Sequence, residues 1–276
     1  MAITDEDRRN FKIRSRIKHD YDYVESKGYK VFGVFLQGSQ NYELDYAGSD
    51  IDTKCIVLPS FEDIVLKKPP VSTTLILEDN SHIDLKDVRL MWDCFRKQNI
   101  NFLEILFTNY WEIRNIDYLL QWQDMMYMAE NIAHYNNYAA VNCIAGMVFE
   151  KRKALCHPYP SIKDKVEKYG YDNKQLHHII RCEEFLRRYI DDVPYEDCLI
   201  PTNKEHLINV KSKYIYNVDE AKQLAKELED KVKEIKQNYM DTHECKVNHK
   251  VSEYMDKILV NILKISLMQD MEVHNG

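Results

Sequence analysis

One stretch near the amino terminus constrains the fold of this chain more than any other. An apolar run at residues 31–36 leads into Gly38-Ser39, and Ser-Asp-Ile-Asp at residues 49–52 precedes a second apolar run at residues 55–58. Short apolar runs bounded by turn signals are typical of strands. The stretch therefore predicts a strand, a tight turn, a helical segment and a second strand.

Two carboxylates stand at the start of the second predicted strand. Side chains at i and i+2 share one face of a strand, so we expect Asp50 and Asp52 to point the same way, with Ile51 buried opposite. Neighbouring carboxylates repel each other unless a cation lies between them, and a hard divalent ion suits oxygen ligands. The pair predicts a site for Mg²⁺ (or Mn²⁺) that substrate phosphates would complete. The alternative is a helix cap followed by a solvated acidic turn.

The Gly-Ser turn supplies groups that suit a phosphate. Gly38 permits a tight turn and lets a ligand approach the backbone closely. Ser39 can cap the following helix and donate its hydroxyl, and the free amides at a helix N-terminus attract anions. We therefore expect Gly38 and Ser39 to bind phosphates beside the metal ion.

These residues together resemble the G-S…D-x-D signature of the DNA polymerase β-type nucleotidyltransferase superfamily. The resemblance implies a metal-dependent transfer of a nucleoside monophosphate from an NTP to an acceptor hydroxyl, with pyrophosphate released. It also implies a third carboxylate from a neighbouring strand. Asp84 alternates with Ile83 and Leu85 as in a half-buried strand, whereas Asp87 comes where the pattern turns helical and is better interpreted as an N-cap. Asp84 is therefore the predicted third residue, which would ligate the catalytic metal ion and polarise the acceptor hydroxyl.

Two later blocks resemble one family of that superfamily, the predicted RNA-ligase-associated (RlaP-like) nucleotidyltransferases. Residues 99–107, Asn-Ile-Asn-Phe-Leu-Glu-Ile-Leu-Phe, are similar to its N-P-N-x-L-E-x-L-F segment, with Ile100 in place of the proline. Residues 170–181 are similar to its G-Y-D-x-K-x-x-x-H-x-x-R block. The resemblance implies nucleotidyl-transfer chemistry more firmly than it implies a substrate.

The second block places three basic residues on one helical face. Lys174, His178 and Arg181 are spaced i, i+4 and i+7. Lysine binds phosphate as a point charge and arginine binds it through two N–H groups. We predict that this helix lies across the cleft and clamps the NTP phosphates opposite the Gly-Ser turn. The alternative is a solvated basic face, or a histidine packed for structural reasons.

The organisation of the chain predicts an α+β protein. A length of 276 residues exceeds one domain of about 100–200 residues, and the pattern from about Lys86 onward is almost wholly helical. We expect a small mixed β-sheet domain of the polymerase β-like type at residues 1–110. A helical bundle domain at 111–276 would close the NTP cleft. A single domain is the alternative.

Several elements outside the motifs can also be predicted from their spacing. Segments 5–27, 218–238 and 250–269 have helical periodicity, and segments 72–77 and 82–85 flank the turn pair Asp79-Asn80, which predicts a hairpin.

Composition limits the surroundings of the protein. Apolar runs stay below the roughly 18 residues of a membrane span, the first nine residues lack a secretory core, and seven cysteines form no C-x-x-C pair. We therefore expect a cytoplasmic protein with no membrane partner.

The net charge of −7 disfavours a broad nucleic-acid surface but not a local groove. The residues expected in the cleft besides the carboxylates include Lys54 and Lys86, and the basic N-terminal helix would either be solvated or steer an acceptor. This positive charge favours an RNA end or another nucleotide over a cationic small molecule. A non-catalytic nucleotide-binding or antitoxin-like module, and a protein-modifying nucleotidyltransferase, remain the alternatives.

Overall fold

The computed structural model describes residues 4–46, 48–79 and 81–274 of the chain. Five strands in these residues form one sheet, in the order β3-β4-β2-β1-β5. The strands are β1 (Lys30–Gln37), β2 (Asp52–Leu58), β3 (Ser72–Ile76), β4 (His82–Asp87) and β5 (Trp111–Glu112). The pairing of β2 with β4 is parallel and the other pairings are antiparallel, so the sheet is mixed, as the sequence predicts.

The predicted strands and hairpin are confirmed. The two apolar runs around the Gly-Ser turn form β1 and β2, and β3 pairs with β4 as an antiparallel hairpin. Asn80 of the predicted turn pair lies outside the described residues. Asp87 ends β4 and caps the next helix by accepting a hydrogen bond from the backbone N–H of Arg89, as predicted.

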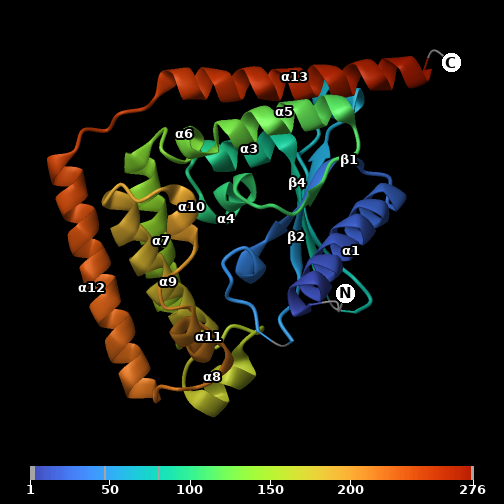
Figure 1. The fold of residues 1–276 in the computed structure, drawn as a ribbon. Helices are drawn as coiled ribbons and strands as arrows, with labels where there is room; N and C mark the ends of the chain where they lie inside the picture. The colour runs from blue at the N-terminus through green and yellow to red at the C-terminus, as the bar shows by residue number, and fades with distance from the viewer. Residues whose placement is uncertain (1–3, 47, 80, 275–276) are drawn as a thin grey trace.

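Helices cover both faces of the sheet, because both faces of its strands are apolar (Figure 1). On one face lies α1 (Asp5–Ser26), whose Ile17 and Val24 pack with Val34 of β1. On the other face lie α3 (Val88–Arg96) and α5 (Ile116–Tyr127). They pack against the side chains that the same strands direct to that opposite face.

Most of the chain beyond the sheet is helical. The further helical segments in the described residues are α2 (Phe61–Val65), η1 (Gly38–Gln40), α4 (Ile100–Leu103), η2 (Glu104–Leu106), α6 (Ala129–Ala133), α7 (Asn137–Ala154), α8 (Lys163–Tyr169), α9 (Asn173–Ile190), α10 (Tyr195–Leu199), α11 (Lys204–Ser212), α12 (Val218–Thr242) and α13 (His249–His274). Helices α7, α9 and α12 pack together, and α13 returns along α5 above the sheet (Figure 1). The predicted α+β class is confirmed. No helix in the parts of the chain described here is long and apolar enough to cross a membrane.

The sheet and the helices share one apolar core. The ring centroids of Phe35 on β1 and Trp122 on α5 lie 4.4 Å apart, and the same cluster of buried residues continues into α7, α9 and α12. The predicted division near residue 110 falls immediately before β5, where Trp111 pairs with Phe35. The sheet therefore extends past that boundary, and the division into two domains stays a prediction.

Candidate functional site

The connection between β1 and β2 begins with a turn rather than the predicted helix. Gly38–Gln40 form a single 3₁₀ turn, and the Ser39 hydroxyl does not cap it. Three residues carry little helix dipole, so the predicted helix contributes little to anion binding, and phosphate binding by Gly38 and Ser39 stays a prediction. Gly38 has φ +79°, and a Cβ at its position would lie 3.4 Å from Oδ2 of Asp52. The turn favours glycine because of this left-handed φ, and the 3.4 Å distance shows that the Asp52 carboxylate lies directly beside the turn.

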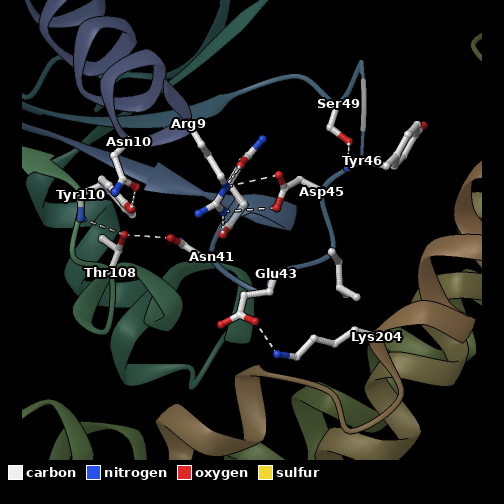
Figure 2. A network of polar contacts seen from close by, with 12 residues as sticks. Arg9, Asn10, Asn41, Glu43, Asp45, Tyr46, Ser49, Thr108, Tyr110 and Lys204 are labelled. Carbon is white, nitrogen blue, oxygen red and sulfur yellow. Dashed lines mark hydrogen bonds and ion pairs between the residues drawn. The ribbon is translucent and has the colours of Figure 1, made fainter. Parts of the chain in front are cut away.

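The loop that follows the turn is held by ion pairs from two distant helices (Figure 2). Arg9 of α1 pairs with Asp45, with 3.2 Å between Nη2 and Oδ1. Lys204 of α11 pairs with Glu43. At least one residue of the basic N-terminal helix, Arg9, therefore positions this loop, an outcome that the sequence analysis did not include.

The three predicted carboxylates do not gather into one cluster. Asp52 is the first residue of β2, opposite Gln37 of β1, and Asp84 lies on β4; both side chains are half-buried and line one cavity. Asp50 precedes the strand, is exposed, and is not part of the cavity lining. The prediction that Asp50 shares a strand face with Asp52 is wrong, because strand pairing begins only at Asp52. Among the residues that the structure describes, no group of three His, Cys, Asp or Glu side chains could hold a metal ion.

Asp84 has a partner that the sequence analysis did not assign to it. Lys54 is the register neighbour of Asp84 across β2 and β4, and its ammonium forms an ion pair with the Asp84 carboxylate. Lys54 lines the cavity, as expected of a cleft residue, whereas Lys86 is not part of the cavity lining. The Nζ of Lys86 donates to the Ser72 hydroxyl at 3.0 Å instead.

A cavity of about 350 Å³ separates the carboxylate edge of the sheet from helices α9 and α11. It brings together all the predicted site residues except Asp50, namely Gly38, Ser39, Asp52, Asp84, Lys174, His178 and Arg181. Carboxylates thus come from β2 and β4, and basic side chains come from α9. The cavity has both a wall that suits a cation and a wall that suits an anion.

The basic face of α9 points into this cavity as predicted, but its three members differ. Asp172 caps the helix by accepting from the backbone N–H of Lys174, whose side chain is exposed. Arg181 is 3 % exposed, and its guanidinium carbon lies 4.1 Å from the centroid of the Tyr42 ring. Within the described residues, Nε and Nη1 of Arg181 have no hydrogen-bond partner. These two nitrogens can donate hydrogen bonds to an anion in the cavity.

His178 does not supply the positive charge that the phosphate clamp requires. Burial, followed by the nearby His177 and the positive charge of Arg181, lowers its pKa well below the ordinary value. The imidazole is therefore neutral at pH 7. His178 does line the cavity, so its part in binding a phosphate stays a prediction, as a neutral side chain rather than as a positive charge.

Glu104 explains part of the 99–107 block. It is buried, and its Oε2 accepts the backbone N–H of Gly38 at 3.1 Å. Burial raises the pKa of Glu104, while a hydrogen bond from Tyr42 and the charge of Arg181 partly oppose that rise. The carboxyl therefore joins the Gly-Ser turn to Tyr42 and α9. The signal for this role was an acid inside an apolar run, Leu103 to Leu106.

Lys211 is a further cavity residue that the sequence analysis missed. It comes from α11 and is half-buried. The pKa of Lys211 is lowered, mainly by burial and then by the neighbouring charge of Lys174. The carboxylates of Asp52, Asp45 and Asp50 oppose this lowering only in part. No local pattern distinguishes Lys211 from Lys204, the other lysine of α11, because its role depends on where that helix packs.

Comparisons with known proteins give little beyond this geometry. The chain matches no model of a known protein family and no curated protein. One solved structure to which it is similar is a nucleotidyltransferase-like protein from Exiguobacterium sibiricum 255-15. The similarity has 11% sequence identity and a TM-score of 0.32, over 79% of this chain and 72% of that chain.

Proposed function

We propose that this protein is a metal-dependent nucleotidyltransferase that moves a nucleoside monophosphate from an NTP to an acceptor hydroxyl. The observation that carries the proposal is the cavity itself. Its sheet wall carries Asp52 and Asp84. Its helical wall carries Lys174, Lys211 and the buried Arg181, whose Nε and Nη1 have no hydrogen-bond partner among the described residues. A triphosphate that is bound to a divalent ion needs both walls at once.

The helical wall would bind the phosphates. Arg181 offers buried N–H groups that have no partner among the described residues, and Lys174 and Lys211 offer ammonium groups at the same cavity. The Ser39 hydroxyl lines the opposite side and would donate to a phosphate oxygen. His178 is uncharged and would contribute shape and a hydrogen bond rather than charge.

The sheet wall fits a divalent ion with few protein ligands. The Asp52 carboxylate forms no hydrogen bond or ion pair with any residue in the described ranges, and it lines the cavity. Mg²⁺ commonly binds through one or two carboxylates plus substrate phosphates. Asp52 would hold it together with phosphate oxygens of the nucleotide. The bound ion would supply charge neutralisation for the phosphates.

The transfer would proceed by a single displacement. The acceptor oxygen forms a bond to the α-phosphorus, the bond from that phosphorus to the bridging oxygen breaks, and pyrophosphate leaves with the electron pair. We assign the acceptor proton to Asp84, the carboxylate that lines the cavity beside Lys54. Arg181 and Lys174 would stabilise the negative charge that develops on the leaving phosphates.

The decisive experiment combines binding with product analysis. Thermal unfolding would be followed with each NTP, with and without Mg²⁺ or Mn²⁺. Protein stabilised by an NTP would then be incubated with the same NTP labelled at the α-phosphate, plus total RNA or protein extract. We expect metal-dependent stabilisation, and one pyrophosphate released for each label transferred. Stabilisation without transfer would favour the non-catalytic nucleotide-binding alternative, and no stabilisation would refute the proposal.

Lys174→Ala should weaken NTP binding about five- to tenfold, because the change removes one partly solvated charge from the phosphate wall. Calorimetric titration of a non-hydrolysable NTP analogue in the presence of Mg²⁺ measures the effect. Lys168→Ala is the matched control, since Lys168 is an exposed lysine on α8 outside the cavity lining. Equal affinities for wild type and Lys174→Ala would remove α9 from the phosphate site.

We propose an RNA end as the acceptor, because the basic groups at the cavity suit an anion. Affinity for a short single-stranded RNA should fall with added salt, with a slope of log K against log salt of about −0.7 for each phosphate contacted. The net charge of −7 implies few contacts and weak binding. A salt-independent affinity, or label recovered on a protein tyrosine or a cationic small molecule, would contradict the RNA acceptor and leave nucleotidyl transfer intact.

A further inference from the structure

An ion pair between β2 and β4 lies in the floor of the cavity. Lys54 and Asp84 are register neighbours in the parallel pairing of these strands, and both side chains line the cavity. The Lys54 side chain is 2 % exposed, and its ammonium lies 4.0 Å from the centroid of the Phe102 ring. Its charge is therefore satisfied inside the site, by one carboxylate and one aromatic face.

A divalent ion at Asp84 would either displace Lys54 from the carboxylate or share the carboxylate with it, since only Oδ2 pairs with the lysine. In either case the lysine would keep a buried positive charge beside a second, doubly charged cation. Displacement would leave a buried charge without a partner, which is strongly unfavourable, and in both cases the two cations would repel each other. Asp52 can bind an ion without breaking an existing ion pair, because its carboxylate has no hydrogen-bond or ion-pair partner in the residues for which the structure gives positions.

We propose that Lys54 is a resident cation that takes the place of a second metal ion. It holds Asp84 by the ion pair and restricts the site to one divalent ion, bound at Asp52 with phosphate oxygens of the nucleotide. The inference rests on the proposed nucleotidyltransferase function and adds to it the number of metal ions. Asp84 then acts as the base, positioned by Lys54, and not as a metal ligand.

The number of bound ions tests the proposal directly. Mn²⁺ would be titrated into the full-length protein and followed by electron paramagnetic resonance, with α,β-methylene-ATP equimolar to the chain. We expect one Mn²⁺ per chain for wild type and for Asp84→Asn. We expect two for Lys54→Met, because that change releases Asp84. The double variant Lys54→Met/Asp84→Asn should return to one.

A second readout needs no nucleotide. Mn²⁺ alone should bind about tenfold more tightly to Lys54→Met than to wild type, because a neighbouring positive charge is lost and a carboxylate is freed. Lys86→Met is the matched control and should behave as wild type. The Lys86 ammonium lies 4.9 Å from the centroid of the same Phe102 ring, but Lys86 is not part of the cavity lining.

Each result separates this inference from the function on which it rests. Two Mn²⁺ per wild-type chain with the analogue bound, or loss of an ion in Asp84→Asn, would overturn the single-ion site and leave the transferase proposal standing. Failure of every variant to bind the analogue would overturn both. Should Lys54→Met not fold, the wild-type and Asp84→Asn counts still decide, because Asp84→Asn keeps an isosteric side chain.

Discussion

Asp52→Asn should lower the rate of nucleotidyl transfer about a thousandfold while the protein stays folded. The variant removes the charge that would hold the divalent ion, and a loss of about 4 kcal/mol of transition-state stabilisation corresponds to that factor. The cost to stability should be small, because no hydrogen bond or ion pair of the Asp52 side chain within the described residues is broken. Pyrophosphate release under saturating NTP and Mg²⁺ measures the rate, and thermal unfolding verifies the fold.

A matched control for this experiment is Asp164→Asn, which removes the same charge from an exposed position on α8 outside the cavity lining. It should transfer at the wild-type rate. A folded Asp52→Asn protein with wild-type transfer would show that the ion lies elsewhere, and the assignment of the sheet wall as the metal side would have to be withdrawn.

Trp122→Ala should lower the free energy of unfolding by about 3–5 kcal/mol. Trp122 is fully buried, and its ring packs at centroid distances of 4.4 Å from Phe35 and 6.0 Å from Phe32 on β1. The variant would leave a cavity at the contact between the sheet and α5. Urea unfolding measured by far-ultraviolet circular dichroism and by intrinsic fluorescence gives the change in stability.

The same measurement tests whether the sheet and the helices unfold together. The sheet and the helices share one apolar core, so we expect a single cooperative unfolding transition. In Trp122→Ala this whole transition should shift to a lower urea concentration. Leu120→Ala is the control: Leu120 is 51 % exposed on the same helix, so stability should change by less than about 0.5 kcal/mol. Two transitions, of which only one shifts, would support the division into domains near residue 110.

Local patterns in the sequence were enough to predict the elements that carry the site. Apolar runs ending at Gly38 and beginning after Asp52 predicted β1 and β2, because strand formation and turns depend on neighbouring residues. The i, i+4, i+7 spacing predicted that Lys174 and Arg181 would share one face of α9, because helical periodicity alone places them there. The same reasoning failed for Asp50, which was expected on the strand beside Asp52. The start of β2 is set by the point at which β1 can pair with it, and that depends on the partner strand rather than on neighbouring residues.

The charge state and partners of the site residues depended on packing between distant segments. Asp84 meets Lys54 because β2 and β4 pair in parallel, a register between segments about thirty residues apart that no local pattern specifies. His178 is neutral, and the environment of Arg181 is buried, because other elements cover that face of α9. Burial and ion pairing are properties of the assembled fold, since they depend on which side chains exclude water from each group. The sequence therefore predicts which residues line the cavity better than it predicts what each of them can do there.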